Sequence, residues 1–211
     1  MATRILMRAG AFSVPDNATS VDRRLVMAYA DPPYVGQSFK HYRDHPAYRG
    51  EVDHGHLIEW LIKDYPDGWA LSASSPSLRE LLPLCPSEAR VMAWVKPFAA
   101  FKRNVRVAYA WEPVIVVPAP RLDGAAPTRD FVDDLRLIDL DAAVREPITM
   151  RRGFTGAKPD RFCWWLFEAM GLRPADELHD LFPGSGAVAK SWAKWRTRYS
   201  EAVPERLALD A

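Results

Sequence analysis

Residues 24–34 read RLVMAYADPPY, a nearly continuous apolar run that ends at an acidic residue, two prolines and a tyrosine. A continuous run of this kind is typical of a strand that is buried on both faces in a parallel sheet. The strand is expected to end at Asp31, because Pro32 and Pro33 cannot donate hydrogen bonds to a β-ladder. The stretch therefore predicts a carboxylate at the tip of a buried strand.

Strand and helix patterns alternate along the rest of the chain. A polar, aromatic loop is expected from Tyr34 to Glu51, followed by a helix that Asp53 caps. Further strands are expected at residues 69–73, 90–95, 105–117 (a hairpin or bulged pair broken near Glu112 and Pro113) and 177–182, and further helices at 77–82, 159–170 and 187–199. This alternation predicts an α/β fold with a largely parallel sheet.

The composition is that of an ordinary globular protein, with 48% hydrophobic and 26% charged residues among 211. This length fits a single domain, residues 1–211. A net charge of only +1 means that contact with nucleic acid must come from a local basic patch. Cys85 and Cys163 lack metal-ligand spacing, so no metal site is expected and a reducing, cytoplasmic location is favoured. No apolar run approaches the roughly 20 residues that span a bilayer.

The first chemical motif is Asp31-Pro32-Pro33-Tyr34. The Asp31 carboxylate and the Pro32 carbonyl can both accept hydrogen bonds from an amino group held in plane. Such acceptors localise the lone pair of a base's exocyclic amine and orient it, which is catalysis by positioning and electrostatics. Tyr34 can stack on the ring. The alternative is an Asp-Pro-Pro turn that only ends a strand.

The second motif is the glycine-rich segment DLFPGSG, residues 180–186, between an expected strand and an expected helix. Gly184 and Gly186 let the backbone pass close to a ligand, and the amides at the helix start offer donors to a carboxylate. A lone Gly-x-Gly after a strand is a weak signal. The two motifs together are far more specific.

Together these motifs resemble those of the S-adenosylmethionine (SAM)-dependent DNA adenine amino methyltransferases. Lys158-Pro159 resembles the Lys-Pro element that precedes the glycine loop in permuted members. The order, with the catalytic motif first and the glycine loop last, is similar to the β class of these enzymes and to the related RNA adenosine methyltransferases. Residues 94–96 and 111–116 resemble the strands between the motifs, so the resemblance spans roughly residues 24–199.

The resemblance implies a Rossmann-like methyltransferase sheet of about seven mostly parallel strands, with circularly permuted motif order. SAM would lie across the carboxyl ends of the central strands, as open α/β sheets generally bind ligands. A flipped-out adenine would be held by Asp31, Pro32, Pro33 and Tyr34. The implied cofactor-binding residues are Ala30, Lys158, Pro159, Asp180, Phe182, Pro183, Gly184, Ser185 and Gly186.

The implied partner is nucleic acid, most simply DNA, bound by a monomer or homodimer of a bacterial or phage type of enzyme. Lys40, Tyr42 and Arg43 follow the catalytic motif and combine cations with an aromatic ring, which suits phosphate and base contacts. A solvated loop is the alternative interpretation. Residues 118–157 are the candidate for a small recognition insert.

One feature departs from the family pattern. In such enzymes the glycine loop and its helix are followed by a strand whose terminal acid or amide binds the ribose of SAM. The acids after the expected final helix are Glu201, Glu205 and Asp210, and none follows a strand pattern. Two other functions therefore stay open: methylation of RNA or a small amine, and a degenerate methyltransferase fold that serves as a nucleic-acid-binding or partner subunit.

Overall fold

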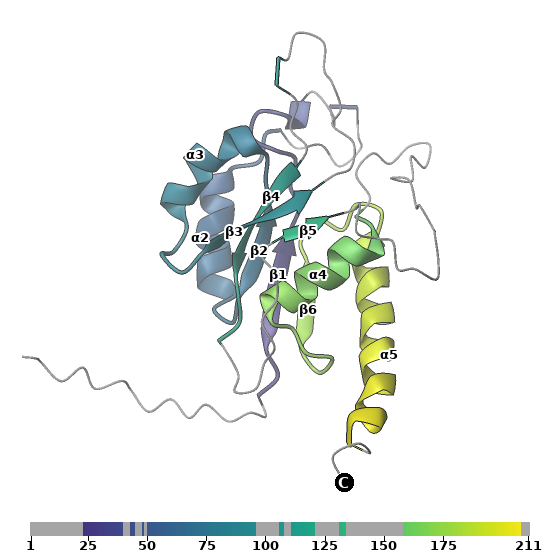
Figure 1. The fold of residues 1–211 in the computed structure, drawn as a ribbon. Helices are drawn as coiled ribbons and strands as arrows, with labels where there is room; N and C mark the ends of the chain where they lie inside the picture. Colours follow the sequence, from purple (N-terminus) through teal and green to yellow (C-terminus); the bar gives the residue numbers. More distant parts are fainter. Residues whose placement is uncertain are drawn as a thin grey trace, which may run out of the picture.

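A computed structural model describes residues 23–39, 43–44, 48, 50–95, 106–107, 111–120, 131–133 and 158–207. Within this part of the chain, a β-sheet is covered by helices on both faces (Figure 1). Helices α2 (His54–Asp64) and α3 (Leu78–Leu81) cover one face, and α4 (Asp160–Met170) and α5 (Ala187–Leu207) cover the other. The predicted α/β class is confirmed. None of these helices is both long and apolar enough to cross a lipid bilayer.

The described sheet has six strands in the order β5-β3-β4-β2-β1-β6. Pairing is parallel for β1–β2, β1–β6 and β3–β5, and antiparallel for β2–β4 and β3–β4. Five strands therefore run in one direction and β4 runs in the opposite direction, in agreement with the predicted largely parallel sheet. The expected count of about seven strands is not reached among the described residues. The strands are β1 (Val26–Ala30), β2 (Trp69–Ser72), β3 (Arg90–Val95), β4 (Trp111–Val117), β5 (Phe131–Asp133) and β6 (Glu177–Asp180).

Strand β1 is buried on both faces, as its sequence predicts. Met27 and Tyr29 point into the core beneath α4 and α5, whereas Ala28 and Ala30 point into the core beneath α2. This alternation follows from the two-residue period of a strand. All four side chains are fully buried, and the hydroxyl group of Tyr29 forms a hydrogen bond with Ser72 Oγ at 2.8 Å.

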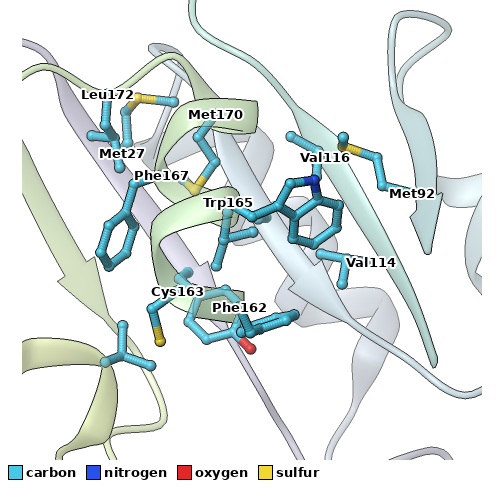
Figure 2. Close-up of a cluster of buried hydrophobic side chains, with 14 of the residues drawn as sticks. Met27, Met92, Val114, Val116, Phe162, Cys163, Trp165, Phe167, Met170 and Leu172 are labelled. Carbon is cyan, nitrogen blue, oxygen red and sulfur yellow. The ribbon is translucent and has the colours of Figure 1, made fainter. Parts of the chain in front are cut away.

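The core beneath α4 is rich in aromatic side chains. Figure 2 shows Phe162 and Trp165 turned from α4 toward Val114 and Val116 of β4. Cys163 is also fully buried there, and burial raises the pKa of its thiol to about 12. The thiol is thus protonated at neutral pH, which agrees with its expected role as a small core residue.

Strand β4 corrects the predicted break near Glu112 and Pro113. The strand runs without interruption through Pro113, which pairs in register with Ala93 of β3. The N–H and C=O groups of a strand residue point to the same side, and the Pro113 carbonyl accepts a hydrogen bond from Ala73 N at 3.0 Å. The missing N–H therefore faces the β2 side, beyond the last ladder pair of β2 at Ser72, so that the pairing of β4 with β3 continues past Pro113.

The ends of two elements also differ from the prediction. The predicted last strand, 177–182, ends at Asp180 and is half-buried, because β6 is the edge strand of the described sheet. Helix α5 continues to Leu207, beyond the predicted end near Tyr199. Pro204, a residue that usually ends helices, lies within its last turn.

Other helix ends follow their sequence signals. Asp53 caps α2 by accepting a hydrogen bond from His56 N at 3.0 Å, and Gly171 ends α4 in the left-handed conformation with φ 78°. Pro159 stands immediately before α4. The amino end of α4 lies next to the segment that follows β1, because Lys158, directly before Pro159, forms an ion pair with Asp31.

Candidate functional site

The two sequence motifs lie side by side. Strands β1 and β6 are parallel neighbours, with Tyr29 in register with Asp180. Leu181 N donates a hydrogen bond of 2.9 Å to the carbonyl oxygen of Tyr29. Because parallel strands end at the same edge of a sheet, the segment that begins at Asp31 lies beside the segment that begins at Asp180.

Asp31 forms a largely buried ion pair with Lys158. Lys158 Nζ lies 3.0 Å from Asp31 Oδ1, and the two side chains are 6% and 24% exposed. The ammonium group also lies 5.1 Å from the ring centroid of Trp94 and 5.6 Å from that of Phe162. Burial lowers the pKa of Lys158, but the charges of Asp31 and Glu112 outweigh it, so that the pKa is raised and the lysine is charged.

Tyr34 is held by a residue of β4, a strand of the same sheet as β1. Its hydroxyl group donates a hydrogen bond of 2.9 Å to Glu112 Oε2 at the start of β4. The carbonyl oxygen of Tyr34 accepts a hydrogen bond from Gln37 N at 2.8 Å, and Pro32 is buried. The Asp-Pro-Pro-Tyr motif is therefore a fixed turn rather than a loose loop. The sequence prediction placed Glu112 near a break in a strand and gave it no role in the site; its position next to a proline within an apolar run was the available signal.

Asp180 has an unpaired oxygen inside the protein. Its Oδ1 accepts a hydrogen bond from Phe182 N at 3.3 Å, whereas its Oδ2 is buried and has no partner among the described residues. Burial raises the pKa of Asp180, the hydrogen bond from Phe182 opposes this, and the charge of Asp31 raises the pKa further. A buried carboxylate oxygen without a donor fits a site that a polar ligand completes.

The glycine loop has the backbone conformation that glycine allows. Gly184 and Gly186 have φ of 45° and 70°, and a Cβ built on Gly186 would meet no atom within 4 Å. The loop turns through a hydrogen bond from Gly186 N to the Pro183 carbonyl oxygen and then enters α5. Pro183 and Ser185 are exposed. Open space around the backbone before a long helix suits a ligand with a carboxylate, so the residues present fit SAM.

The loop after Tyr34 is only partly described. Lys40 and Tyr42 lie outside the described residues, as does most of the expected insert at 118–157. The Arg43 side chain is 58% exposed, and its guanidinium group lies 5.5 Å from the ring centroid of Phe39, which is itself 57% exposed. The sequence did not predict the contact between the exposed ring of Phe39 and Arg43, because the residues that flank Phe39 show no regular helix or strand pattern.

Glu51 fixes the backbone of this loop. Its carboxylate accepts hydrogen bonds from Phe39 N at 2.9 Å and from Ser38 N at 3.2 Å. The bond from Phe39 is the main cause that lowers the pKa of Glu51. The sequence predicted Glu51 only as the last residue of the loop that begins at Tyr34, and not its contacts with the loop backbone.

His54, at the start of α2, is buried, and its Nδ1 lies 3.0 Å from the Val52 carbonyl oxygen. Glu201 and Glu205 lie within α5 rather than after a strand, and Asp210 lies outside the described residues. No group of three or more metal-ligating side chains is found among the described residues.

A solved structure has a similar fold. The crystal structure of a complex of M1.HpyAVI with SAM superposes with a TM-score of 0.53, covering 82% of this chain and 79% of that chain. The two chains have the same fold. Their sequences are 12% identical, so the likeness concerns the fold alone. No protein-family model matches the chain, and no curated protein matches it.

Proposed function

We propose that the chain is a SAM-dependent methyltransferase that methylates the exocyclic amino group of adenine in DNA. One observation carries the proposal: Asp31 and the Asp180–Gly186 segment lie at the carboxyl ends of two neighbouring parallel strands, β1 and β6. An amine bound at Asp31 would therefore meet a methyl donor bound at the Asp180–Gly186 segment. The fold likeness to a protein crystallised with SAM supports the donor. The order of the two motifs agrees with that of a circularly permuted DNA adenine amino methyltransferase. We propose that residues 1–211 form a single methyltransferase domain.

The amine is held on the Asp31 side. Asp31 and the Pro32 carbonyl accept its two hydrogens, which localises the lone pair on nitrogen and directs it toward the donor. The ring of Tyr34 stacks on the flipped base, and the hydrogen bond to Glu112 fixes the orientation of that ring. Asp in the first position and Tyr in the fourth favour adenine over cytosine.

The donor is held on the Asp180 side. Its amino-acid part lies against the glycine loop, where Gly186 leaves space and Asp180 Oδ2 lacks a partner. SAM supplies a methyl group on a sulfonium ion: the amine nitrogen bonds to the methyl carbon while the carbon–sulfur bond breaks, its electron pair stays on sulfur, and a proton is then lost to solvent. The other residues assigned to the donor are Ala30, Pro159, Phe182, Pro183, Gly184 and Ser185.

The nucleic acid is held by the loop after Tyr34. Arg43 and Lys40 contact phosphates, while Tyr42 and the exposed ring of Phe39 stack on bases. The segment 118–157, whose strand β5 belongs to the sheet, is proposed to include a small recognition insert. We propose that the protein acts on DNA in the cytoplasm of a bacterial or phage-infected cell, as a monomer or homodimer.

The test compares wild type with Asp31→Asn, using tritiated SAM and DNA, RNA and nucleosides as acceptors. Asn is chosen because it keeps the size of the side chain and an oxygen that can accept a hydrogen bond from Lys158, although it removes the counter-charge of that buried lysine, a loss that destabilises proteins by about 3–5 kcal/mol. Wild type is expected to label adenine in DNA, and Asp31→Asn to lose at least about 100-fold in rate at a temperature at which circular dichroism shows that the variant is folded. Full turnover by Asp31→Asn would rule out the mechanism, and labelling of RNA or nucleosides alone would change the acceptor.

A second candidate is a degenerate methyltransferase fold that serves as a nucleic-acid-binding or partner subunit, because a fold shared at 12% sequence identity carries no catalytic role by itself. Calorimetry separates the two. Measurable SAM binding supports the enzyme, whereas no binding at millimolar SAM supports the binding subunit.

A further inference from the structure

We infer that Lys158 is a positioning residue for Asp31, and that it acts on the amine side of the reaction rather than as a ligand of the donor. This inference rests on the proposed function. The resemblance that singled out Lys158-Pro159 places the lysine next to SAM. The geometry instead places its ammonium group on the catalytic carboxylate.

Lys158 contacts one carboxylate oxygen of Asp31 and does not contact the other. Nζ lies 3.0 Å from Oδ1, and no described residue forms a hydrogen bond with Oδ2. An ionised carboxylate has two oxygens that accept hydrogen bonds. The ion pair therefore fixes the rotamer of Asp31 while Oδ2 stays available for an amine hydrogen.

The ammonium group of Lys158 is enclosed on several sides. Trp94 of β3 and Phe162 of α4 lie against it, and the side chain is only 6% exposed. Cation–π contacts of this kind favour the charged lysine. Burying a charge with so little access to water is tolerated only when the charge is paired, and here the partner is Asp31.

Acidic groups outnumber basic ones around the ammonium group of Lys158. Asp31 from β1, Asp180 from β6 and Glu112 from β4 converge: the charge of Asp31 raises the pKa of Asp180, and Glu112 contributes to the raised pKa of Lys158. The other ionisable groups that face them are Tyr34 from the motif, Tyr29 on β1 and Cys163 on α4. Lys158 supplies the positive charge that balances these carboxyl groups before SAM brings its own.

The test substitutes Lys158 and separates binding from chemistry. Lys158→Met keeps an unbranched side chain in the aromatic pocket but removes the charge, and Lys158→Arg keeps the charge. Lys194→Met is the matched control, because Lys194 forms an ion pair with Asp160, two residues along from Lys158, and is 61% exposed. SAM affinity is measured by calorimetry, and kcat and KM for DNA are measured across pH.

For Lys158→Met we expect a SAM Kd within about threefold of wild type. We also expect kcat to fall by about 100-fold, the typical loss from a misplaced catalytic group, and the acid limb of the pH profile to move to higher pH. Lys158→Arg restores part of the rate and the pH profile, and Lys194→Met resembles wild type in both. A Kd for SAM raised more than tenfold in Lys158→Met, with kcat unchanged at saturating SAM, would overturn the inference and make Lys158 a donor ligand.

A second readout does not need activity. Crystal structures of wild type and Lys158→Met compare the orientation of the Asp31 side chain directly. We expect the Asp31 carboxylate to adopt another rotamer in the variant, and the same rotamer in both proteins would refute the positioning role. Failure of the proposed function would appear differently, as wild type without methyl transfer to any acceptor.

Discussion

At the scale of single residues, the account depends on a few side chains whose partners lie far away in the sequence. Asp31 pairs with Lys158, and Tyr34 pairs with Glu112. The sequence supplied the chemistry of Asp31 and Tyr34, because an acidic strand end before two prolines is a local pattern. It could not supply their partners, because a contact between distant residues depends on how the strands assemble.

Gly186 gives a prediction at this scale. Gly186→Ala places a methyl group in space that is open in the protein alone, so folding loses only the cost of a left-handed residue, about 1–2 kcal/mol. The same methyl group lies where SAM is proposed to bind. We therefore expect the SAM Kd to rise at least about tenfold, a loss of about 1.4 kcal/mol of binding free energy, measured by calorimetry.

Gly50→Ala is the matched control for this variant. Gly50 also has a positive φ, 102°, and a Cβ there would also meet nothing within 4 Å. It should lose a similar amount of stability and bind SAM as wild type does. Unchanged SAM affinity in Gly186→Ala would show that the donor does not approach this part of the loop.

At the scale of elements, sequence patterns predicted those parts of the fold that local physics decides. The strand at 90–95 and the helix capped by Asp53 have the expected bounds or caps, because apolar periodicity and capping are local. The continuity of β4 through Pro113 was not predicted, because it depends on where β2 stops pairing. The edge position of β6 depends likewise on the order of the whole sheet.

The amino end of β1 gives a second prediction. Asp176 is 1% exposed; its Oδ1 accepts a hydrogen bond from Leu25 N at 2.9 Å, and its carboxylate pairs with Arg173 at 2.7 Å. Burial raises the pKa of Asp176, but the bonds from Arg173 and Leu25 outweigh it, so that the pKa lies below its usual value. The contribution to stability is therefore complete above about pH 4, the unfolded pKa, and is lost as pH falls through the lowered pKa.

We expect Asp176→Asn to lower the free energy of unfolding by about 3 kcal/mol at pH 7, measured by urea denaturation. Its stability should also fall less on acidification than that of wild type, because the titrating group has been removed. Asp44→Asn, a change at a side chain that is 92% exposed, should leave both quantities as they are in wild type. Parallel pH profiles for wild type and Asp176→Asn would contradict this assignment.

At the scale of the whole molecule, the sheet order explains why the two motifs meet although they are far apart in the chain. Strands β1 and β6 are neighbours, and both end at the edge where Asp31 and Asp180 stand (Figure 1). Helix α4 brings Lys158 to the same edge, since Lys158 and Pro159 directly precede it. The resemblance predicted this meeting, and the topology provides the physical reason for it.

A crystal structure of the protein with SAM tests the central claim most directly. We predict that the amino-acid part of SAM lies along residues 182–186, with its methyl group directed toward Asp31 and space left between them for an amine about 3–3.5 Å from the methyl carbon. SAM bound elsewhere, or bound at the glycine loop with its methyl group directed away from Asp31, would contradict the account.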